Sequence, residues 1–230
     1  MPVRLNKFLA ERIGVSRREA DNLIEHGKIL IDDKPAGIGA RVSDNQEVKY
    51  RGKVIPHEKK YTYLLMNKPV GYVCSRKRQG NIPTLYELLP EEYRHLKTVG
   101  RLDKDSSGLI LLTNDGDFAL RMTHPRYSKT KIYEVTLDHP LVPLHQQMIS
   151  DFGINLKDGP SQLLLTPLDD SRKYYQVTMK EGRNRQIRRT FGALGYTVET
   201  LHRTAFGPYY LGDLEAGHYL RTHKEPRNQK

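Results

Sequence analysis

Residues 100–108 read GRLDKDSSG and continue without a break into the apolar run LILLT at residues 109–113. The apolar run predicts a buried strand, and the polar stretch bounded by glycines predicts a loop that leads into it. Asp103 lies in this loop beside Arg101, and the small residues at 106–108 leave space for the close approach of a bulky ligand. A carboxylate in this position is either a structural cap of the loop or a nucleophile held at the end of a sheet.

The chain carries a strong excess of positive charge. Its 230 residues include 38 lysines and arginines against 27 aspartates and glutamates, which gives a formal net charge of +11 and a pI near 9.6. This balance favours nucleic acid as the partner; an anionic membrane surface and an ordinary basic soluble protein are the alternatives. The single cysteine, Cys74, excludes an internal disulfide and a cysteine-rich zinc site, and it fits a reducing compartment.

Residues 1–58 are expected to form a compact module with the order helix, helix, strand. Apolar residues recur at helical spacing within 5–13, and Ser16 with Glu19 forms a capping box that starts a second helix. A strand is expected at 29–31. Basic residues cluster around the two helices, and they predict either a phosphate-binding surface or an ordinary solvated face: Arg4, Lys7, Arg17, Arg18 and Lys28.

A polar, proline-containing stretch at 54–60 is the expected linker, and a second domain is expected over 61–230. Its strands and helices do not alternate strictly, which favours an α+β fold with a mixed, mostly antiparallel sheet flanked by helices. The expected strands are 61–65, 109–113, 132–137, 163–165, 174–179, 196–201 and 218–222, and the expected helices are 84–89, 118–122, 144–149 and 185–194.

The segment 182–189, GRNRQIRR, carries four arginines at the expected start of a helix. Asn184 is a good helix N-cap, and the helix start with its arginines predicts an anion site. The mutual repulsion of Arg185, Arg188 and Arg189 is tolerable only beside anions or carboxylates. One of the arginines is therefore expected to pair with Asp103 while the others meet phosphates; a solvated basic face is the alternative.

Lys131 and Tyr133 enter a strand two residues apart, so both side chains project from the same face. An aromatic ring there is either a platform for a base that has left its stack or a core tyrosine. The scattered histidines His124, His139 and His145 have no metal-ligand spacing, and the sequence has neither a P-loop nor a dinucleotide fingerprint. We therefore expect no metal and no cofactor.

Taken together, these stretches resemble the RsuA/RluB family of ribosomal RNA pseudouridine synthases over essentially the whole chain. Residues 1–58 resemble an S4-type RNA-binding module, and 100–116 resemble the signature of the family. Residues 131–133 and 182–189 resemble its second and third motifs. The resemblance implies an S4-like α-α-β module followed by a larger catalytic domain that isomerises uridine to pseudouridine.

The resemblance also implies a role for each matching residue. Asp103 is the expected nucleophile, Tyr133 packs against the target uracil, Arg188 pairs with the aspartate, and Ile187 is an apolar wall of the pocket. The expected substrate-binding residues are Arg101, Lys131, Asn184, Arg185 and Ile187. The expected contacts to RNA are Arg4, Lys7, Arg17, Arg18, Lys28, Arg183 and Arg189.

Two rival functions stay open beside the enzyme. A noncatalytic RNA-binding or ribosome-assembly protein would explain the charge and the module, and a nucleoside glycosidase would need Asp105 as a second carboxylate. For the enzyme, attack of Asp103 at C1′ of the ribose and at C6 of the base are both open. Lys7 and Arg12 interrupt any apolar core at the N-terminus. We expect a cytoplasmic monomer that acts on ribosomal RNA or an assembly intermediate and has no membrane partner.

Overall fold

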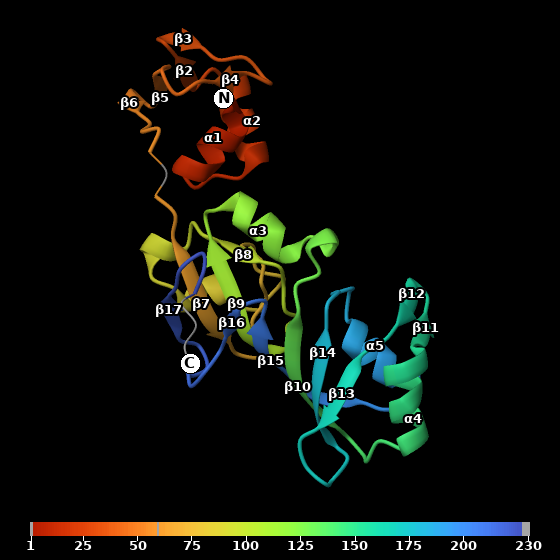
Figure 1. Cartoon of the computed structure of the whole chain (residues 1–230). Coiled ribbons are helices and arrows are strands. Elements are labelled where there is room, and N and C mark those ends of the chain that lie inside the picture. The colour runs from red at the N-terminus through yellow and green to blue at the C-terminus, as the bar shows by residue number, and fades with distance from the viewer. Residues whose placement is uncertain (1, 59, 227–230) are drawn as a thin grey trace. The chain divides into compact units, whose positions relative to one another are not determined.

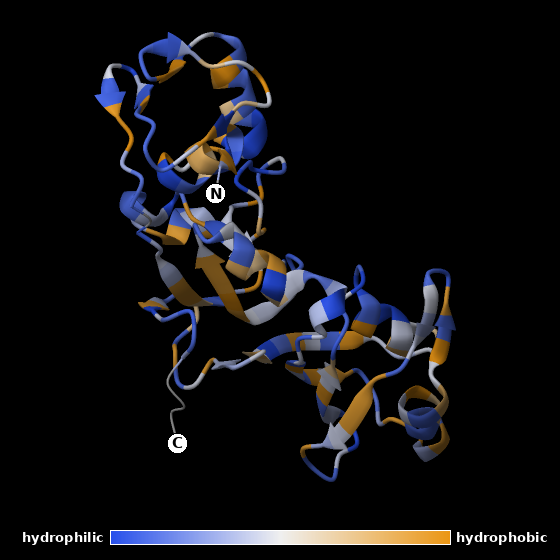
Figure 2. Cartoon of the chain, turned by 45° about the horizontal axis from the view of Figure 1, so that its top comes forward, coloured by the Kyte–Doolittle hydropathy of each residue, from blue (hydrophilic) through white to orange (hydrophobic). Residues whose placement is uncertain are grey.

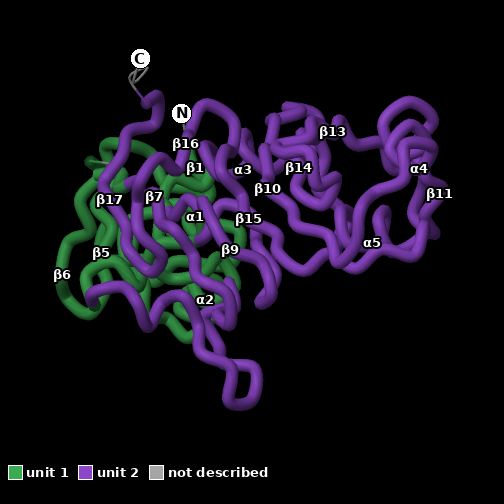
Figure 3. Tube along the Cα trace, turned by 90° about the horizontal axis from the view of Figure 1, so that it is seen from below, with its two compact units in different colours: residues 1–62, 91–97, 113–116 green, residues 63–90, 98–112, 117–230 purple. Residues whose placement is uncertain are grey.

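The computed structural model describes residues 2–58 and 60–226. Contacts within the chain divide it into two compact units (Figure 3). Unit 1 comprises residues 1–62 together with 91–97 and 113–116, and unit 2 comprises 63–90, 98–112 and 117–230. Two short segments from the middle of the chain thus belong with the N-terminal part, which the pattern of the sequence did not indicate.

Unit 1 is a small α and β module built on one apolar cluster. Leu5, Phe8 and Leu9 of the first helix pack with Ala20 and Ile24 of the second and with residues from its strands. The second helix begins as predicted, because the Ser16 hydroxyl accepts from the Glu19 amide at 3.1 Å and the Glu19 carboxylate accepts from the Ser16 amide. The elements are β1 (Val3–Arg4), α1 (Leu5–Arg12), α2 (Arg17–Glu25), β2 (Ile29–Ile31), β3 (Lys34–Pro35), β4 (Arg41–Val42), β5 (Val48–Tyr50) and β6 (Lys53–Val54).

The strands of unit 1 form a four-stranded sheet in the order β3-β2-β5-β6 and a separate β1-β4 pair, all antiparallel. The loop segments of unit 1 from later in the chain include the short 3-10 helix η2 (Glu91–Tyr93).

Unit 2 is organised around one large sheet (Figure 1). Within the described residues its strands follow the order β13-β14-β10-β15-β9-β7-β17, with β16 beside β15 and β8 beside β9. The strands are β7 (Tyr63–Lys68), β8 (Lys97–Val99), β9 (Ser107–Thr113), β10 (Lys131–Leu137), β13 (Leu164–Pro167), β14 (Tyr174–Met179), β15 (Val198–Phe206), β16 (Tyr209–Tyr210) and β17 (Tyr219–Arg221). The pairing of β15 with β9 is parallel, whereas β10 pairs antiparallel with both β14 and β15, so the predicted mixed, mostly antiparallel sheet is confirmed.

The remaining elements of unit 2 are short. They are η1 (Leu85–Leu88), α3 (Gly116–Thr123), η3 (Pro125–Tyr127), α4 (Pro143–Gln147), the π-turn η4 (Met148–Phe152), the hairpin of β11 (Ile154–Leu156) and β12 (Gly159–Ser161), and α5 (Gln186–Gly192). Apolar residues concentrate on the strands (Figure 2), and β9 is buried from Gly108 to Thr113. No helix in residues 2–58 and 60–226 combines the length and the hydropathy of a membrane span.

The start of α5 differs from the prediction. The helix begins at Gln186 and its N-cap is Arg185, in the left-handed region at φ 46°, with no side-chain cap. Asn184 therefore does not cap the helix. The side chain of Gln186 instead accepts from the Arg183 amide at 3.0 Å, which closes the turn one residue later than the composition predicted. Seven residues of helix remain, too few to serve as an anion site through their backbone amides alone.

Candidate active site

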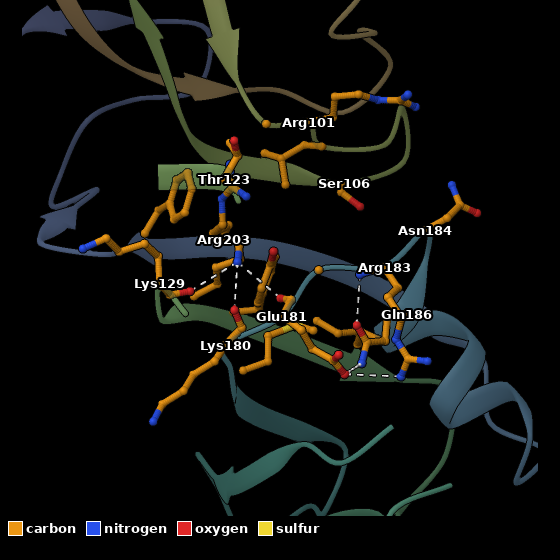
Figure 4. A pocket seen from close by; sticks show the side chains of 18 of the residues that line it. Arg101, Ser106, Thr123, Lys129, Lys180, Glu181, Arg183, Asn184, Gln186 and Arg203 are labelled. Carbon is orange, nitrogen blue, oxygen red and sulfur yellow. Dashed lines mark hydrogen bonds and ion pairs between the residues drawn. The ribbon is translucent and has the colours of Figure 1, made fainter. Parts of the chain in front are cut away.

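A pocket of about 420 Å³ lies within unit 2, where the loop before β9 faces β10, β15 and the segment before α5 (Figure 4). Its volume is in the range of small-ligand sites. Eight of the residues predicted from the sequence line it together: Arg101, Asp103, Lys131, Tyr133, Arg183, Asn184, Arg185 and Ile187. Arg188 and Arg189 are absent from its lining. The fold thus gathers all three motifs, which are up to about 80 residues apart in the chain, around one cavity.

The loop that carries Asp103 is fixed from behind through its backbone. The buried ammonium of Lys68 donates to the Ser106 carbonyl at 2.7 Å, and the Gly71 amide donates to the Lys104 carbonyl at 2.8 Å. Burial lowers the pKa of Lys68 to about 8, against a smaller raising effect of nearby anionic groups that include Asp103. With the loop fixed in this way, Asp103, whose side chain is 26% exposed, lines the pocket together with Arg101 and Ser106.

The glycine of this loop serves a different purpose from the one predicted. Gly108 has φ 102°, and a Cβ built on it would lie 2.3 Å from the carbonyl oxygen of Arg203 on the neighbouring parallel strand. Its lack of a side chain admits the backbone of β15, not a ligand. Ser107 donates to or accepts from His202 at 2.8 Å, so among residues 106–108 only Ser106 lines the pocket.

Arg185 is the arginine that pairs with Asp103. Its Nη1 lies 3.8 Å from Asp103 Oδ2 and 3.6 Å from Asp105 Oδ2, distances of ion pairs and too long for hydrogen bonds. Arg185 has a left-handed backbone at the start of α5 and makes no side-chain cap of that helix. Because Arg185 stands between two carboxylates, it provides positive charge at the nucleophile candidate without being locked to one oxygen.

Arg188, which the resemblance assigned to this ion pair, makes other contacts. It donates to the backbone carbonyl of Asp105 at 2.8 Å and to the carbonyl of Val198. Burial and the neighbouring Arg185 lower the pKa of Arg188, and the negative charges of Asp105 and Asp103 partly oppose that shift. The pairing predicted for Arg188 is thus replaced by Arg185, and Arg188 ties the loop of Asp103 to β15.

The two outer arginines of the segment are bound to the protein itself. Arg189 forms a two-pronged contact with the Asp158 carboxylate at 2.9 and 2.8 Å. Arg183 donates to the carbonyls of Asp158, Gly159 and Pro160 at 2.7–2.9 Å. A carboxylate is therefore present beside these arginines, as predicted from their mutual repulsion. Both guanidinium groups form most of their hydrogen bonds with residues of unit 2.

Lys131 and Tyr133 share the pocket, as the two-residue spacing predicted. Tyr133 is only 7% exposed and its ring forms part of the wall. The Lys131 ammonium donates to the carbonyls of Lys129, Lys180 and Glu181 at 3.2–3.4 Å. Burial, and next the charge of Arg203, lower the pKa of Lys131 to about 8. Lys131 therefore fastens the segment before α5 to the start of β10.

Arg203 is a pocket residue that the sequence analysis missed. It is 2% exposed, on β15, and lies opposite Tyr133 in the sheet. The signal was present in the alternation of the strand, because Leu201, Arg203 and Ala205 occupy the same buried face. A charged residue at an inward-facing position of a strand is a stronger indication of a functional site than a charged residue within a basic cluster.

Unit 1 displays several of the predicted RNA-contacting residues on its surface. Arg4, Arg17, Arg18 and Lys28 are exposed at the ends of its helices and strands. In the described part of the chain, no cluster of three or more histidine, cysteine or acidic side chains is arranged to hold a metal ion.

Known proteins match this chain over nearly its whole length. A family model described as RNA pseudouridylate synthase matches residues 62–193, and a model of the S4 domain matches residues 3–48. Ribosomal small subunit pseudouridine synthase A of Pasteurella multocida is 36% identical over 223 residues and covers 94% of each chain. Ribosomal large subunit pseudouridine synthase B of Bacillus subtilis is 33% identical, over 93% of this chain and 89% of its own. A crystal structure of a pseudouridylate synthase superposes with a TM-score of 0.68 at 32% identity, over 96% of each chain.

Proposed function

The chain belongs to the RNA pseudouridylate synthase family, and we propose that it converts specific uridines of ribosomal RNA to pseudouridine with Asp103 as the nucleophile. The observation that carries this proposal is the Asp103 carboxylate, which faces a pocket that also holds Arg185 and Tyr133. The names of the relatives from Pasteurella multocida and Bacillus subtilis support ribosomal RNA as the substrate. The surplus of positive charge on the chain agrees with that class of partner.

The reaction exchanges one bond between base and sugar for another. The bond from ribose C1′ to uracil N1 breaks, a bond from C1′ to C5 forms, and the proton leaves C5 while N1 gains one. No electron is gained or lost overall, so side chains that hold the base and supply one nucleophile suffice. The pocket of unit 2 has room for one nucleobase, and its lining provides such side chains.

Five of the residues that line the pocket have proposed roles in this reaction. The target uridine leaves its helix, at a cost of a few kcal/mol, and its base packs against Tyr133, which recovers about 1–3 kcal/mol. Ile187 is the proposed apolar side of the base site, and Arg101 and Asn184, both exposed, are the proposed contacts to the flanking RNA. Asp103 then attacks C1′ of the ribose or C6 of the uracil.

Two further basic residues hold the machinery in place. Arg188 fixes the loop of Asp103 through the Asp105 carbonyl, and Lys131 fixes the segment that carries Arg185. Both are positioning residues in this scheme. In unit 1, Arg4, Lys7, Arg17, Arg18 and Lys28 are the proposed phosphate contacts, which set the register of the RNA without reading its sequence. Arg183 and Arg189 retain a smaller proposed share of RNA binding, because Asp158 already pairs with both. For this basic protein we propose a monomer in the cytoplasm.

The test is release of tritium from ribosomal RNA labelled at uracil C5 and transcribed without modifications. The expected result is tritium release that matches, mole for mole, the pseudouridine found in the digested RNA. Release of free uracil would instead identify a glycosidase, and tight RNA binding with neither product would identify a noncatalytic RNA-binding protein. Asp105→Asn is the control against the glycosidase, since that reaction needs a second carboxylate and the isomerisation does not.

A further inference from the structure

Arg203 is a buried cation at the wall of the pocket, and no carboxylate of residues 2–58 or 60–226 pairs with it. Its side chain is 2% exposed and lines the pocket drawn in Figure 4. Asp103 and Tyr133 line the same pocket. Arg203 and Tyr133 are directly opposite each other on antiparallel strands, so both side chains project from the same face of the sheet. The guanidinium is therefore close to the ring on which the target base is proposed to lie.

The contacts of Arg203 leave part of its hydrogen-bonding capacity unused. Nε donates to the Leu109 carbonyl at 2.7 Å, whereas Nη2 is buried and has no hydrogen-bond partner. Among the residues that the structure describes, no carboxylate forms an ion pair with it. Its guanidinium carbon lies 4.9 Å from the centre of the Phe206 ring and 6.0 Å from that of Tyr133. Ring contacts alone do not offset the cost of burying an unpaired charge.

Lys131, a half-buried cation of the same pocket, differs in this respect. The three protons of the Lys131 ammonium have three backbone carbonyls as acceptors. The three protons of Lys131 thus have acceptors within the fold, whereas the guanidinium of Arg203 has a donor without an acceptor. An oxygen-bearing ligand in the pocket would complete its hydrogen bonds.

The proposed reaction provides such a ligand. When Asp103 attacks C1′, its oxygen bonds to that carbon, the bond to N1 breaks, and the electron pair that stays on N1 spreads onto the uracil oxygens O2 and O4. When Asp103 attacks C6, the displaced electron pair moves onto O4. In both routes a negative charge develops on a carbonyl oxygen of the base, and a fixed donor aimed at that charge lowers the barrier.

We infer that Arg203 is a further catalytic residue, which donates a hydrogen bond through its guanidinium to a carbonyl oxygen of the flipped uracil and stabilises the charge that develops there. This inference rests on the proposed function. Arg203 keeps its proton throughout, because a guanidinium does not lose one in proteins. Arg203 therefore contributes to the rate of the reaction and not to the affinity for RNA, since phosphate contacts dominate that affinity.

The experiment compares Arg203→Met with Arg172→Met in the tritium-release assay. Arg172 is a matched control, because its Nε also donates to a backbone carbonyl at 2.7 Å, of Leu141, and it does not line the pocket. Arg203→Met is expected to lose about 100-fold or more in kcat with an unchanged Kd for RNA, as expected when one donor to a developing charge is removed. Arg172→Met is expected to keep the kcat of the unmodified chain.

A rescue experiment separates catalysis from folding. Methylguanidinium added to Arg203→Ala is expected to restore at least part of the lost kcat, whereas urea at the same concentration restores none. Full kcat in a folded Arg203→Met, or a loss confined to RNA affinity, would overturn the inference while the function stands. If the unmodified chain releases no tritium, the proposed function fails and this inference fails with it. If Arg203→Met does not fold, absence of rescue in Arg203→Ala overturns the inference.

Discussion

The arginines of residues 183–189 and the lone Arg203 are in opposite electrostatic situations. Arg183 and Arg189 share the Asp158 carboxylate, and Arg185 lies between Asp103 and Asp105. Arg203 is more deeply buried than any of them and has no carboxylate partner in the described residues. Carboxylates of the fold thus offset much of the positive charge of residues 183–189. Arg203, which pairs with none in the described residues, is the arginine that a negatively charged ligand would stabilise most.

The number of cations in a segment is therefore a poor measure of its affinity for an external anion. Exposed ion pairs such as Arg189 with Asp158 hold their position at little net gain in stability. A buried guanidinium with a donor that lacks an acceptor lowers the stability of the folded chain, and a ligand that supplies the acceptor removes this cost. The comparison can be broken at three points.

The largest effect is expected within the cluster itself. Arg185→Met removes the cation beside Asp103, and we expect a loss in kcat of about 100-fold or more. Arg189→Met removes a cation whose carboxylate partner is on the β11–β12 hairpin, and we expect turnover close to that of the unmodified chain. Steady-state tritium release from both variants is the measurement. Equal losses in the two would show that the cluster acts as one undivided basic patch.

The second effect concerns the strand contact that places Arg203. Gly108→Ala forces a side chain to within 2.3 Å of the Arg203 carbonyl at a φ that L-residues rarely adopt, and we expect about 3 kcal/mol of lost stability. Gly116→Ala is the control, because a Cβ there meets no atom within 4 Å. Urea denaturation of both variants gives the free energies of unfolding. A fully stable Gly108→Ala would contradict the close approach of β9 and β15.

The smallest effect is a pH dependence that depends on Lys131. Its folded-state pKa of about 8 lies below the ordinary 10.5, so the unfolded chain binds the proton more tightly between these values. The cost of burying the charge is therefore full below about pH 8 and disappears as the pH rises toward 10.5. Relative to Lys131→Met, the unmodified chain should gain stability over that interval. Urea denaturation of both proteins between about pH 8 and pH 10.5 tests this direction. A difference in the free energy of unfolding that stays constant with pH would contradict the assigned burial of Lys131.

Much of the fold was predictable because it depends on local patterns. The capping box at Ser16 and Glu19, the buried strand at 109–113 and the mostly antiparallel sheet all follow from apolar spacing and turn chemistry. The start of α5 was not predictable in this way. Asn184 has the side chain of a good cap, but Arg185 takes a left-handed backbone and Gln186 closes the turn. Gln186 also donates to the Ser161 hydroxyl at 3.0 Å, a contact between residues far apart in the chain that no local pattern predicts.

The residues that line the site were more predictable than the ion pairs between them. Asp103, Tyr133 and Ile187 were placed in one pocket by the resemblance, and the structure brings them together. The partner of Asp103 depends on a backbone angle at Arg185, which no spacing rule reveals. The environment of Arg203 depends on the pairing of β15 with β9, two strands far apart in the sequence. That Nη2 of Arg203 has no hydrogen-bond acceptor is therefore evident only from the three-dimensional structure.

The most direct measurement compares Asp103→Asn with Asp105→Asn on C5-tritiated ribosomal RNA. The two carboxylates lie two residues apart, both contact Arg185, and both substitutions remove one negative charge at nearly the same volume. The account predicts no detectable tritium release from Asp103→Asn and near-normal release from Asp105→Asn, with equal RNA affinity. Isomerisation at the normal rate by Asp103→Asn would contradict the central claim.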